Sequence, residues 1–516
     1  MTWSNAFVNS LDLPSKTTEY ALRFIGHSND YFLGAGATIR QSGLINIAAA
    51  EVTIDNARVT PQRWSVNFGG FSILINGDLR PIDVSAFRKG AIAELHMRRN
   101  GIPERVAIGQ LRSLSGGRGV WRLEFGDFIS ALTSRLSTKK EELNFYYNAG
   151  KSTVVTSGHT FSFGSSPADR LYLDDITIFE KDSNFDGMAF VTNTSSGNTS
   201  YYRWSGKTAT TGTAGYLTIT DTGQWPAIAD LNGLAVGDKV VSIARLQGRP
   251  DFVFARTLMS TGGATQGTYD DYPASWGSGI DWNPNLINNQ DMSLWYNAYK
   301  TASGAHEVQF AIDTPQDSGI RYLIDKFLNM GMWPVFRQGK ISWRVCQDPE
   351  LALNVTISAH IKNNDIIAIE SHAIYSPSQS VVYAKSTIVT SSAVGNEVRS
   401  SVDISNVQAL PANDEISRDN KLIYRIDTPA QSAQAVVDLA RMAPWDQYTY
   451  EELVLAVHER FAGLVAGDIV AITSGYIYGF KEATGKTYLG RRGMILGVRW
   501  LPNQSRCILS IGVLSK

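Results

Sequence analysis

The sequence predicts a mainly β protein of the α+β class. Two β-barrel domains, each with one helix, are expected at the ends of the chain, with a β-rich and an α/β domain inserted between them. Short apolar segments of alternating polarity, separated by Gly-, Asn- or Pro-containing turns, fill the first 135 residues and recur from about residue 366 onward. Each of these regions also contains one helical segment, and 516 residues are enough for about three or four domains.

The first expected domain, residues 1–138, is the N-terminal barrel. Its strand-like segments are 20–25, 44–50, 52–55, 71–75, 91–98 and 119–125. Asp127 is a suitable N-cap for a short helix over residues 128–137, which would lead into the next domain.

Residues 139–254 are expected to form an inserted β-rich domain. The region is rich in Thr, Ser and Gly, and its clearest apolar segments are 188–191 and 216–219. Gly237 and Asp238 form a turn signal in front of a further strand that reaches residue 243.

Residues 255–365 are expected to form an α/β central domain that opens with a loop rich in Gly and aromatic residues. Residues 318–330 are amphipathic with helical spacing, and Gly331 should end this helix. Segments 333–336 and 340–345 flank a Gln-Gly turn and predict a hairpin.

The last expected domain, residues 366–516, is the C-terminal barrel. Its expected strands are 366–369, 380–388, 469–472, 494–500 and 507–514, with a helix over 431–442 that ends before Pro444. Gly467 and Asp468 repeat the Gly-Asp turn signal, and Pro502-Asn503-Gln504 predicts the last turn.

Composition excludes several classes of function. The 47 basic and 48 acidic residues give a formal net charge of −1, which argues against a dedicated nucleic-acid binder. Only 18% of residues are charged, and the chain is rich in aromatic residues, which suggests that other subunits cover much of its surface. There is no secretory signal, and no segment approaches the 18 apolar residues of a membrane-spanning helix.

Metal and redox motifs are missing from the sequence. Cys346 and Cys507 are too far apart for a CxxC site, and whether they pair is left open. No two histidines lie within five residues of each other, so a metal-binding HExxH motif is excluded; they are His27, His96, His159, His306, His360, His372 and His458. His458 is expected to be a structural or exposed strand residue and not a base.

Candidate catalytic residues have simpler structural interpretations. Asp270-Asp271 and Asp174-Asp175 are candidates for a glycosidase carboxylate pair, but adjacent carboxylates more often lie in solvated turns. Four loop aromatics are candidates for sugar stacking, although packing of the long loop explains them better: Tyr269, Tyr272, Trp276 and Trp282.

The basic pairs Arg98-Arg99 and Arg491-Arg492 are candidates for contacts with DNA or another protein in a lumen, but are interpreted as solvated turn residues. The nucleophile-elbow, Walker A and dinucleotide motifs are absent. We therefore assign no catalytic, cofactor-binding or metal-binding residue and expect a protein that is not an enzyme.

Several motifs together resemble one family. They are AGDIVAIT at 466–473 with GMILGVRW at 493–500 and a closing strand, TPQRWSVNFGGFSILINGDLRP at 60–81, and LMSTGG followed by YDDYPASWGSGI at 258–280. This pattern resembles the tail hub (baseplate hub, tail-tip) proteins of tailed bacteriophages, with siphophages and gene transfer agents the most similar. The resemblance covers residues 1–135 and 255–516 well and residues 140–250 only in style.

The resemblance implies a structural virion protein with two tail-tube-like barrels. Such a protein would form a homotrimer at the tail tip that adapts the six-fold tail tube, or distal tail protein hexamer, to a three-fold central fibre. It would contact receptor-binding proteins and the tape-measure protein. It would also close the lumen until host attachment triggers genome ejection, when DNA passes without specific binding.

The family has no catalytic residues to transfer, and no enzymatic module is expected after the last strand. Assembly would take place in the cytoplasm of the bacterial host. The alternatives are a host-surface adhesin or carbohydrate-binding tail protein, and a polysaccharide depolymerase.

Overall fold

The computed structural model describes residues 3–13, 17–24, 30–33, 48–61, 65–76, 90–117, 120–127, 150–157, 170–179, 187–195, 197, 199–219, 234–248, 288, 291, 308–312, 324, 327–328, 331–337, 340–350, 357–375, 383–389, 399–403, 415–418, 441–442, 444–445, 448–478 and 487–515. These residues are predominantly β-strand, which confirms the expected mainly β class.

The N-terminal strands form one antiparallel sheet in the order β2-β1-β7-β8-β9-β6-β3. Their bounds are β1 Thr18–Phe24, β2 Asp30–Leu33, β3 Ala48–Asp55, β6 Gly70–Asn76, β7 Ile92–Arg99, β8 Ile102–Gly117 and β9 Val120–Asp127. Helix α1 (Asn5–Ser10) places Phe7 in the core against this sheet, and β4 (Arg58–Thr60) pairs with β5 (Ser65–Asn67).

The sequence missed four N-terminal strands, β2, β4, β5 and β8, and divided another. The sixteen-residue β8 contains Pro103 and three glycines, which weaken a strand pattern, but it pairs on both sides with β7 and β9. The expected strands 44–50 and 52–55 are one strand, β3, with a bulge between Ala49 and Glu51. Asp127 ends β9, and the expected helix over 128–137 lies outside the described residues.

The C-terminal strands pair in a cycle that starts and ends on the same segment of the chain. β19 (Ile357–Lys362) continues through the 3-10 turn η3 (Asn363–Asp365) into β20 (Ile366–Tyr375). β19 pairs with β25 and β20 pairs with β24, so the pairing β25-β26-β27-β24 begins and ends on this segment. The bounds are β24 Thr449–His458, β25 Ile469–Tyr478, β26 Thr487–Leu501 and β27 Arg506–Ser515, with η4 Glu459–Phe461 and η5 Pro502–Gln504 between strands.

A separate small sheet contains β21 (Tyr383–Val389), β22 (Arg399–Asp403) and β23 (Glu415–Arg418). The prediction that the helix over 431–442 ends before Pro444 is wrong, because Pro444 and Trp445 are helical. The Tyr448 N–H donates to the Pro444 carbonyl at 3.0 Å. Proline is compatible with a helical turn where its missing N–H is not needed, and Trp445 is buried at this turn.

The two ends of the chain repeat the same five-strand pattern. The order is β3-β6-β9-β8-β7 in the N-terminal sheet and β20-β24-β27-β26-β25 in the C-terminal one, with antiparallel pairing throughout both. The strands also follow each other along the chain in the same sequence. We call these sets the first and second repeats. They differ beyond their last strand, since β7 pairs antiparallel with β1 while β25 pairs parallel with β19.

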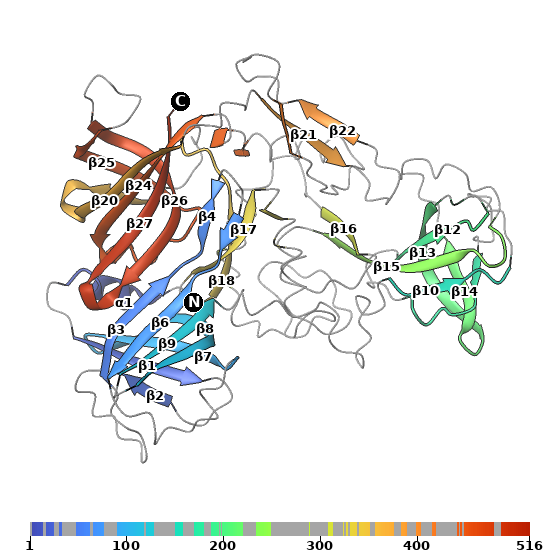
Figure 1. The fold of residues 1–516 in the computed structure, drawn as a ribbon, viewed down its shortest axis with the longest axis horizontal. Coiled ribbons are helices and arrows are strands. Elements are labelled where there is room, and N and C mark those ends of the chain that lie inside the picture. The colour runs from blue at the N-terminus through green and yellow to red at the C-terminus, as the bar shows by residue number, and fades with distance from the viewer. Residues whose placement is uncertain are drawn as a thin grey trace.

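The two repeats share one hydrophobic core. β26 pairs with β3, so a single thirteen-stranded sheet spans both repeats, as Figure 1 shows for the blue and red strands. Buried side chains from both repeats form one cluster that includes Phe71, Phe125, Leu455 and Trp500. Burying each such side chain stabilises by about 1.5–3 kcal/mol, so separating the repeats would expose a large apolar area.

The inserted β-rich region forms a seven-stranded sheet with its own core around Tyr202 and Trp204, at the far end of the molecule in Figure 1. Its strands are β10 Ser152–Val154, β11 Arg170–Leu173, β12 Gly187–Thr192, β13 Thr199–Thr211, β14 Ala214–Ile219, β15 Lys239–Gly248 and β16 Val308–Ile312. The β15–β16 pairing crosses the boundary expected between residues 254 and 255.

The central hairpin is confirmed as β17 (Met332–Arg337) and β18 (Lys340–Val345). The preceding helical residues Ile324, Phe327 and Leu328 are buried, as their spacing predicts. The Gly331 N–H donates to the Leu328 carbonyl at 2.9 Å and ends this helix at the expected residue.

Both Gly-Asp turn signals form the same closed turn. In each, the aspartate N–H donates to the carbonyl three residues earlier, and its carboxylate accepts the N–H of that residue. These pairs are Asp238 with Ala235 and Asp468 with Val465. The glycines have φ of +95° at Gly237 and +100° at Gly467, a region that glycine adopts without strain. The repeated sequence signal thus encodes a repeated local structure.

These two turns allow a matched comparison of backbone strain and crowding. A Cβ at Gly237 meets nothing within 4 Å. Gly237→Ala should therefore lower the free energy of unfolding by only about 1 kcal/mol, the strain of alanine at a positive φ. At Gly467 the Cβ would lie 2.8 Å from the Arg344 Cβ, so Gly467→Ala should cost about 2–4 kcal/mol. Denaturant unfolding of the two variants measures the difference, and equal losses would contradict the role of crowding.

Candidate functional site

The structure brings its two repeats together at a site that we call the junction, where β26 pairs with β3. Trp500 lies opposite Ile54, and Arg499 lies opposite Asp55. The Arg499 Nε also donates to the Asp55 carboxylate at 2.6 Å. Because backbone pairing and a charge-assisted hydrogen bond coincide here, the relative register of the two repeats is fixed.

A buried ion pair lies beside the junction. Arg99, at the end of β7, is 1% exposed and forms an ion pair with Glu459, which is fully buried. Arg99 also donates to the Thr18 hydroxyl, and the Trp500 indole N–H donates to the Glu459 carboxylate at 3.3 Å. A buried charge needs such a set of partners, so this cluster ties the first repeat to the second.

Asn503 forms a third polar link between the repeats. Its side-chain oxygen accepts from the Tyr20 hydroxyl at 3.2 Å and from the Val52 N–H at 3.0 Å. Burial raises the pKa of Tyr20; Arg99 opposes this shift and Glu459 adds to it. The tyrosine therefore remains a neutral hydrogen-bond donor. Asn503 belongs to the turn that the sequence predicts, but nothing in that turn signal indicates the contact with β1 and β3.

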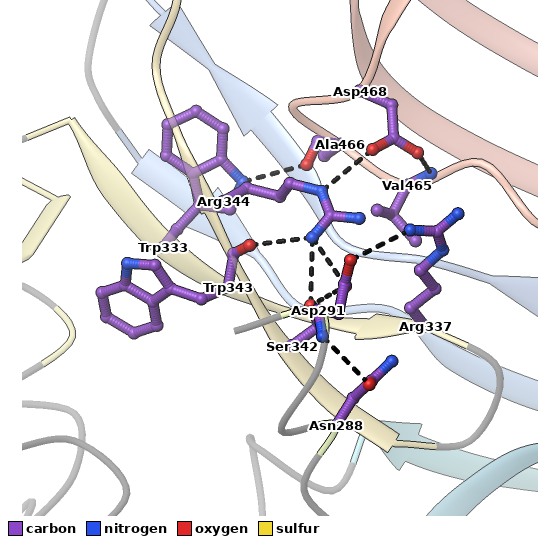
Figure 2. A network of polar contacts seen from close by, with 10 residues as sticks. All are labelled: Asn288, Asp291, Trp333, Arg337, Ser342, Trp343, Arg344, Val465, Ala466 and Asp468. Carbon is purple, nitrogen blue, oxygen red and sulfur yellow. Dashed lines mark hydrogen bonds and ion pairs between the residues drawn. The ribbon is translucent and has the colours of Figure 1, made fainter. Parts of the chain in front are cut away.

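The central hairpin binds the second repeat through Arg344, which is fully buried (Figure 2). Its Nε donates to Asp468 at 2.9 Å, and its Nη1 donates to Asp291 at 2.9 Å. Nη1 also donates to the Ser342 hydroxyl and to the Trp343 carbonyl. We call Asp291, Arg337, Ser342, Arg344 and Asp468 the Arg344 cluster. It connects the hairpin to the Gly-Asp turn that precedes β25.

Electrostatics hold this cluster in its ionised form. Burial alone would raise the pKa of Asp291, but Arg344 and Arg337 outweigh it and hold that pKa below its usual range. For Arg344, burial would lower the pKa, while Asp468 and Asp291 outweigh burial and raise it. Figure 2 also shows the Trp333 indole donating to the Ala466 carbonyl, at 3.2 Å. The hairpin thus contacts two residues of one turn, Ala466 through Trp333 and Asp468 through Arg344.

The structure corrects the interpretation of the basic pairs. Arg98 and Arg99 end a strand: Arg98 pairs with Glu19, and Arg99 is the buried residue described above. Arg491 and Arg492 lie within β26 and not in a turn. Arg491 donates to the Leu514 carbonyl at 2.8 Å and lies over the Tyr488 ring. The solvated-turn interpretation is therefore wrong, because Arg99 is fully engaged in the core and Arg491 holds strand contacts.

Of the two candidate carboxylate pairs, the structure describes only Asp174-Asp175. Asp175 accepts from the Thr177 N–H at 2.8 Å within a local turn, and Asp174 beside it is exposed. Asp270-Asp271 and the aromatics Tyr269, Tyr272, Trp276 and Trp282 lie outside the described residues, as do His27, His159 and His306.

The described histidines are separated. His458 ends β24 and is exposed, as expected, and His360 is exposed on β19. His96 contacts Glu94, and His372 contacts the buried Glu451 at 2.7 Å. Among the residues that the structure describes, no group of three or more His, Cys, Asp or Glu side chains could hold a metal ion.

Cys346 and Cys507 are buried free thiols, which answers the question that the sequence left open. Their sulfur atoms lie near the Arg441 and Glu459 carbonyls, respectively. In the described part of the chain, no helix is both long and apolar enough to span a membrane.

We expect low pH to weaken the contacts of Glu94 with His96 and Arg105 in the first repeat. The hydrogen bond from His96, together with Arg105, lowers the pKa of Glu94 from 4.5 to about 2. A depressed folded-state pKa stabilises above pH 4.5, and this stabilisation is lost as pH falls toward 2. Glu94→Gln should therefore cost about 1–2 kcal/mol at pH 6 and much less at pH 2. Urea unfolding at both pH values tests this, and a cost independent of pH would contradict it.

Comparisons with known proteins give matches in structure only. No protein-family model matches the chain, and no curated protein does. The chain is similar to the tail protein from Neisseria meningitidis MC58, with a TM-score of 0.38, 10% identity and coverage of 97% of each chain.

Two further solved structures are similar to the chain. The 43 kDa tail protein of prophage MuSo2 from Shewanella oneidensis matches with a TM-score of 0.37 and 9% identity, over 97% of this chain and 100% of that one. A chain of the native gene transfer agent virion matches with a TM-score of 0.20 and 13% identity, over 46% of this chain and 84% of that one. The first two of these proteins are described as tail proteins, and the third is part of a virion.

Proposed function

We propose that this protein is a structural virion protein, a trimeric hub at the tip or baseplate of a phage tail, and not an enzyme. The observation that carries the proposal is the repeat of five strands in one order, joined at the junction into one sheet and one core. A chain that contains two rigidly joined repeats offers two similar faces to a larger ring. The motifs that resemble tail hub proteins add support from the sequence.

Symmetry gives the repeats their function. Three copies arranged around an axis present six repeats, which match a six-fold ring such as the tail tube or a distal tail protein hexamer. The same trimer presents three-fold symmetry to a central fibre and its receptor-binding proteins. The repeats would form the two tail-tube-like barrels of each copy. Polar links such as Arg99–Glu459 and Asn503 would keep the two repeats of each copy in register.

The remaining parts of the proposal concern the lumen. The ring would enclose a channel that contains tape-measure protein and stays closed until host attachment triggers genome ejection. A net charge of −1 suits passage of DNA, because a strongly basic wall would bind phosphates. We place the protein at the tail tip of the virion after assembly in the cytoplasm of the host.

Electron microscopy of purified virions, or of the recombinant chain, tests the hub function. We expect a three-copy ring under the last six-fold ring, with both repeats around the axis. Three copies on peripheral fibres would favour the adhesin alternative. A monomer that cleaves polysaccharide would favour the depolymerase alternative, and either result would overturn the proposal.

A further inference from the structure

Strands β3 and β20 occupy the same place in the two repeats but differ in exposure. Ile54 of β3 is 4% exposed, whereas Ile369 and Ile374 of β20 are 43% and 42% exposed. Among the described residues, β20 pairs with β24 alone, while β3 pairs with both β6 and β26. The second repeat therefore exposes an apolar strand at the position that is covered in the first.

The pairing registers show which residues correspond. β3 has a bulge at Ala50, and β20 has one at Ile367 and a second between Ile369 and Ser371. The bulges of the strands that end the comparison decide which one matches. β8 has bulges at Val106 and Arg112, and β26 has bulges at Gly490 and Leu496, six residues apart in both strands. Arg112 therefore corresponds to Leu496.

The strand that covers β3 also has an equivalent. Arg499 of β26 lies in a row of paired residues with Ile508, Ala456 and Ala368. The matching row in the first repeat contains Ser115, Arg122, Leu74 and Glu51. Glu51 and Ala368 each directly follow a bulged residue, so the rows coincide, and Ser115 near the end of β8 corresponds to Arg499. Asp55 pairs with Gly70 and Ala373 with Glu452, each four residues before the row on the neighbouring strand, so Ala373 corresponds to Asp55.

We infer that β20 of one copy pairs with the end of β8 in the neighbouring copy, in the same way as β3 pairs with β26 within the chain. Ala373 would lie opposite Ser115, as Asp55 lies opposite Arg499. The occupant of the exposed edge is thus a second copy of this chain. The pairing would cover the exposed edge of β20 as β26 covers β3.

The chemistry of both surfaces suits this contact. The β8–β9 hairpin end exposes Leu114 and Val120, and Ser115 beside Leu114 is also exposed. Ile367, Ile369 and Ile374 supply the apolar surface on β20. Exposed apolar edge strands favour pairing with another chain, and natural proteins usually protect them.

The contact joins different surfaces of the two copies, so it produces either a closed ring or an open filament. If each repeat is rotated from the next by one sixth of a turn, both within and between copies, three copies close a ring of six repeats. The number of copies, three, rests on the proposed hub function. The pairing of β20 with β8 follows from the repeat itself.

A cysteine pair tests the register. Residues directly opposite each other in antiparallel strands have Cα atoms about 4.5–5.5 Å apart, within the range of a disulfide. We expect the double variant Ser115→Cys/Ala373→Cys of the full chain to give covalent dimers and trimers after mild oxidation, read on a denaturing gel. Each single variant should remain monomeric on that gel. Cys346 and Cys507 are buried and should not interfere.

The junction provides a positive control. Asp55→Cys/Arg499→Cys should form a disulfide within one chain, which shifts the mobility of the monomer without producing multimers. If this control forms and the Ser115/Ala373 pair does not, in a wild-type protein that assembles into rings, the inference is overturned while the hub function stands. A ladder longer than trimers would support the pairing but reject three-fold closure. A wild-type chain that stays monomeric would overturn both.

A charge on β20 tests the same contact without oxidation. Ile374→Asp should weaken self-association by about tenfold or more, since a buried interface residue would become an unpaired charge. Leu489→Asp is the matched control, because Leu489 is 77% exposed on the same repeat and lies outside the proposed contact. Sedimentation of both variants measures the change, and equal effects would contradict the inference.

Discussion

Replacing Arg344 with methionine is expected to lower the free energy of unfolding by about 3–5 kcal/mol. The guanidinium is fully buried between Asp291 and Asp468, each at 2.9 Å. Without it, Asp291 and Asp468 both lose the cation that they share. Protonating these buried carboxylates, or admitting water to them, then costs free energy. Denaturant unfolding followed by tryptophan fluorescence measures this loss, because Trp333 and Trp343 adjoin the cluster.

Arg337→Met is the matched control for this prediction. Arg337 contacts the same Asp291 at 3.1 Å, but its side chain is 28% exposed, and Arg344 continues to neutralise Asp291 after the change. We expect a loss of about 1 kcal/mol or less. Equal losses for the two variants would show that burial of the Arg344 charge is not what makes the cluster strong.

Replacing Arg99 with methionine should also cost about 3–5 kcal/mol, because it leaves the fully buried Glu459 without its cation. The variant should also weaken the link between the two repeats, since Arg99 and Glu459 are 360 residues apart in the sequence. We therefore expect a broader unfolding transition together with the loss of stability. Calorimetry of the full chain measures both quantities.

Arg98→Met is the control, since it removes the neighbouring arginine on the same strand. Arg98 pairs with Glu19, and both side chains are about a third exposed, so the expected loss is below about 1 kcal/mol. A loss as large as that of Arg99→Met would mean that the strand end matters, and not the buried charge. Glu459→Gln combined with Arg99→Met should recover part of the loss, because no buried charge then remains unpaired.

The sequence predicted local structure well where a pattern repeats over neighbouring residues. Alternation identified β1, β6, β7 and β9, and helical spacing identified the buried residues before Gly331. Both Gly-Asp turns follow from local hydrogen bonds that an Asp carboxylate forms with its own turn. The errors lie where distant partners decide the structure. β8 remains a strand despite Pro103 because both neighbours pair with it, and Pro444 is helical where Trp445 packs in the core.

By itself, the sequence determined the β-rich class, most strands and the turns between them, because these depend on residues close together in the chain. It also supplied the motifs that resemble tail hub proteins. Only the tertiary structure decided that Arg99 and Arg344 are buried in ion pairs, that the repeats share one core, and that β20 exposes isoleucines where β3 does not. These features join residues up to several hundred positions apart, and no local pattern of polarity or spacing encodes the partner of a charge at such a separation.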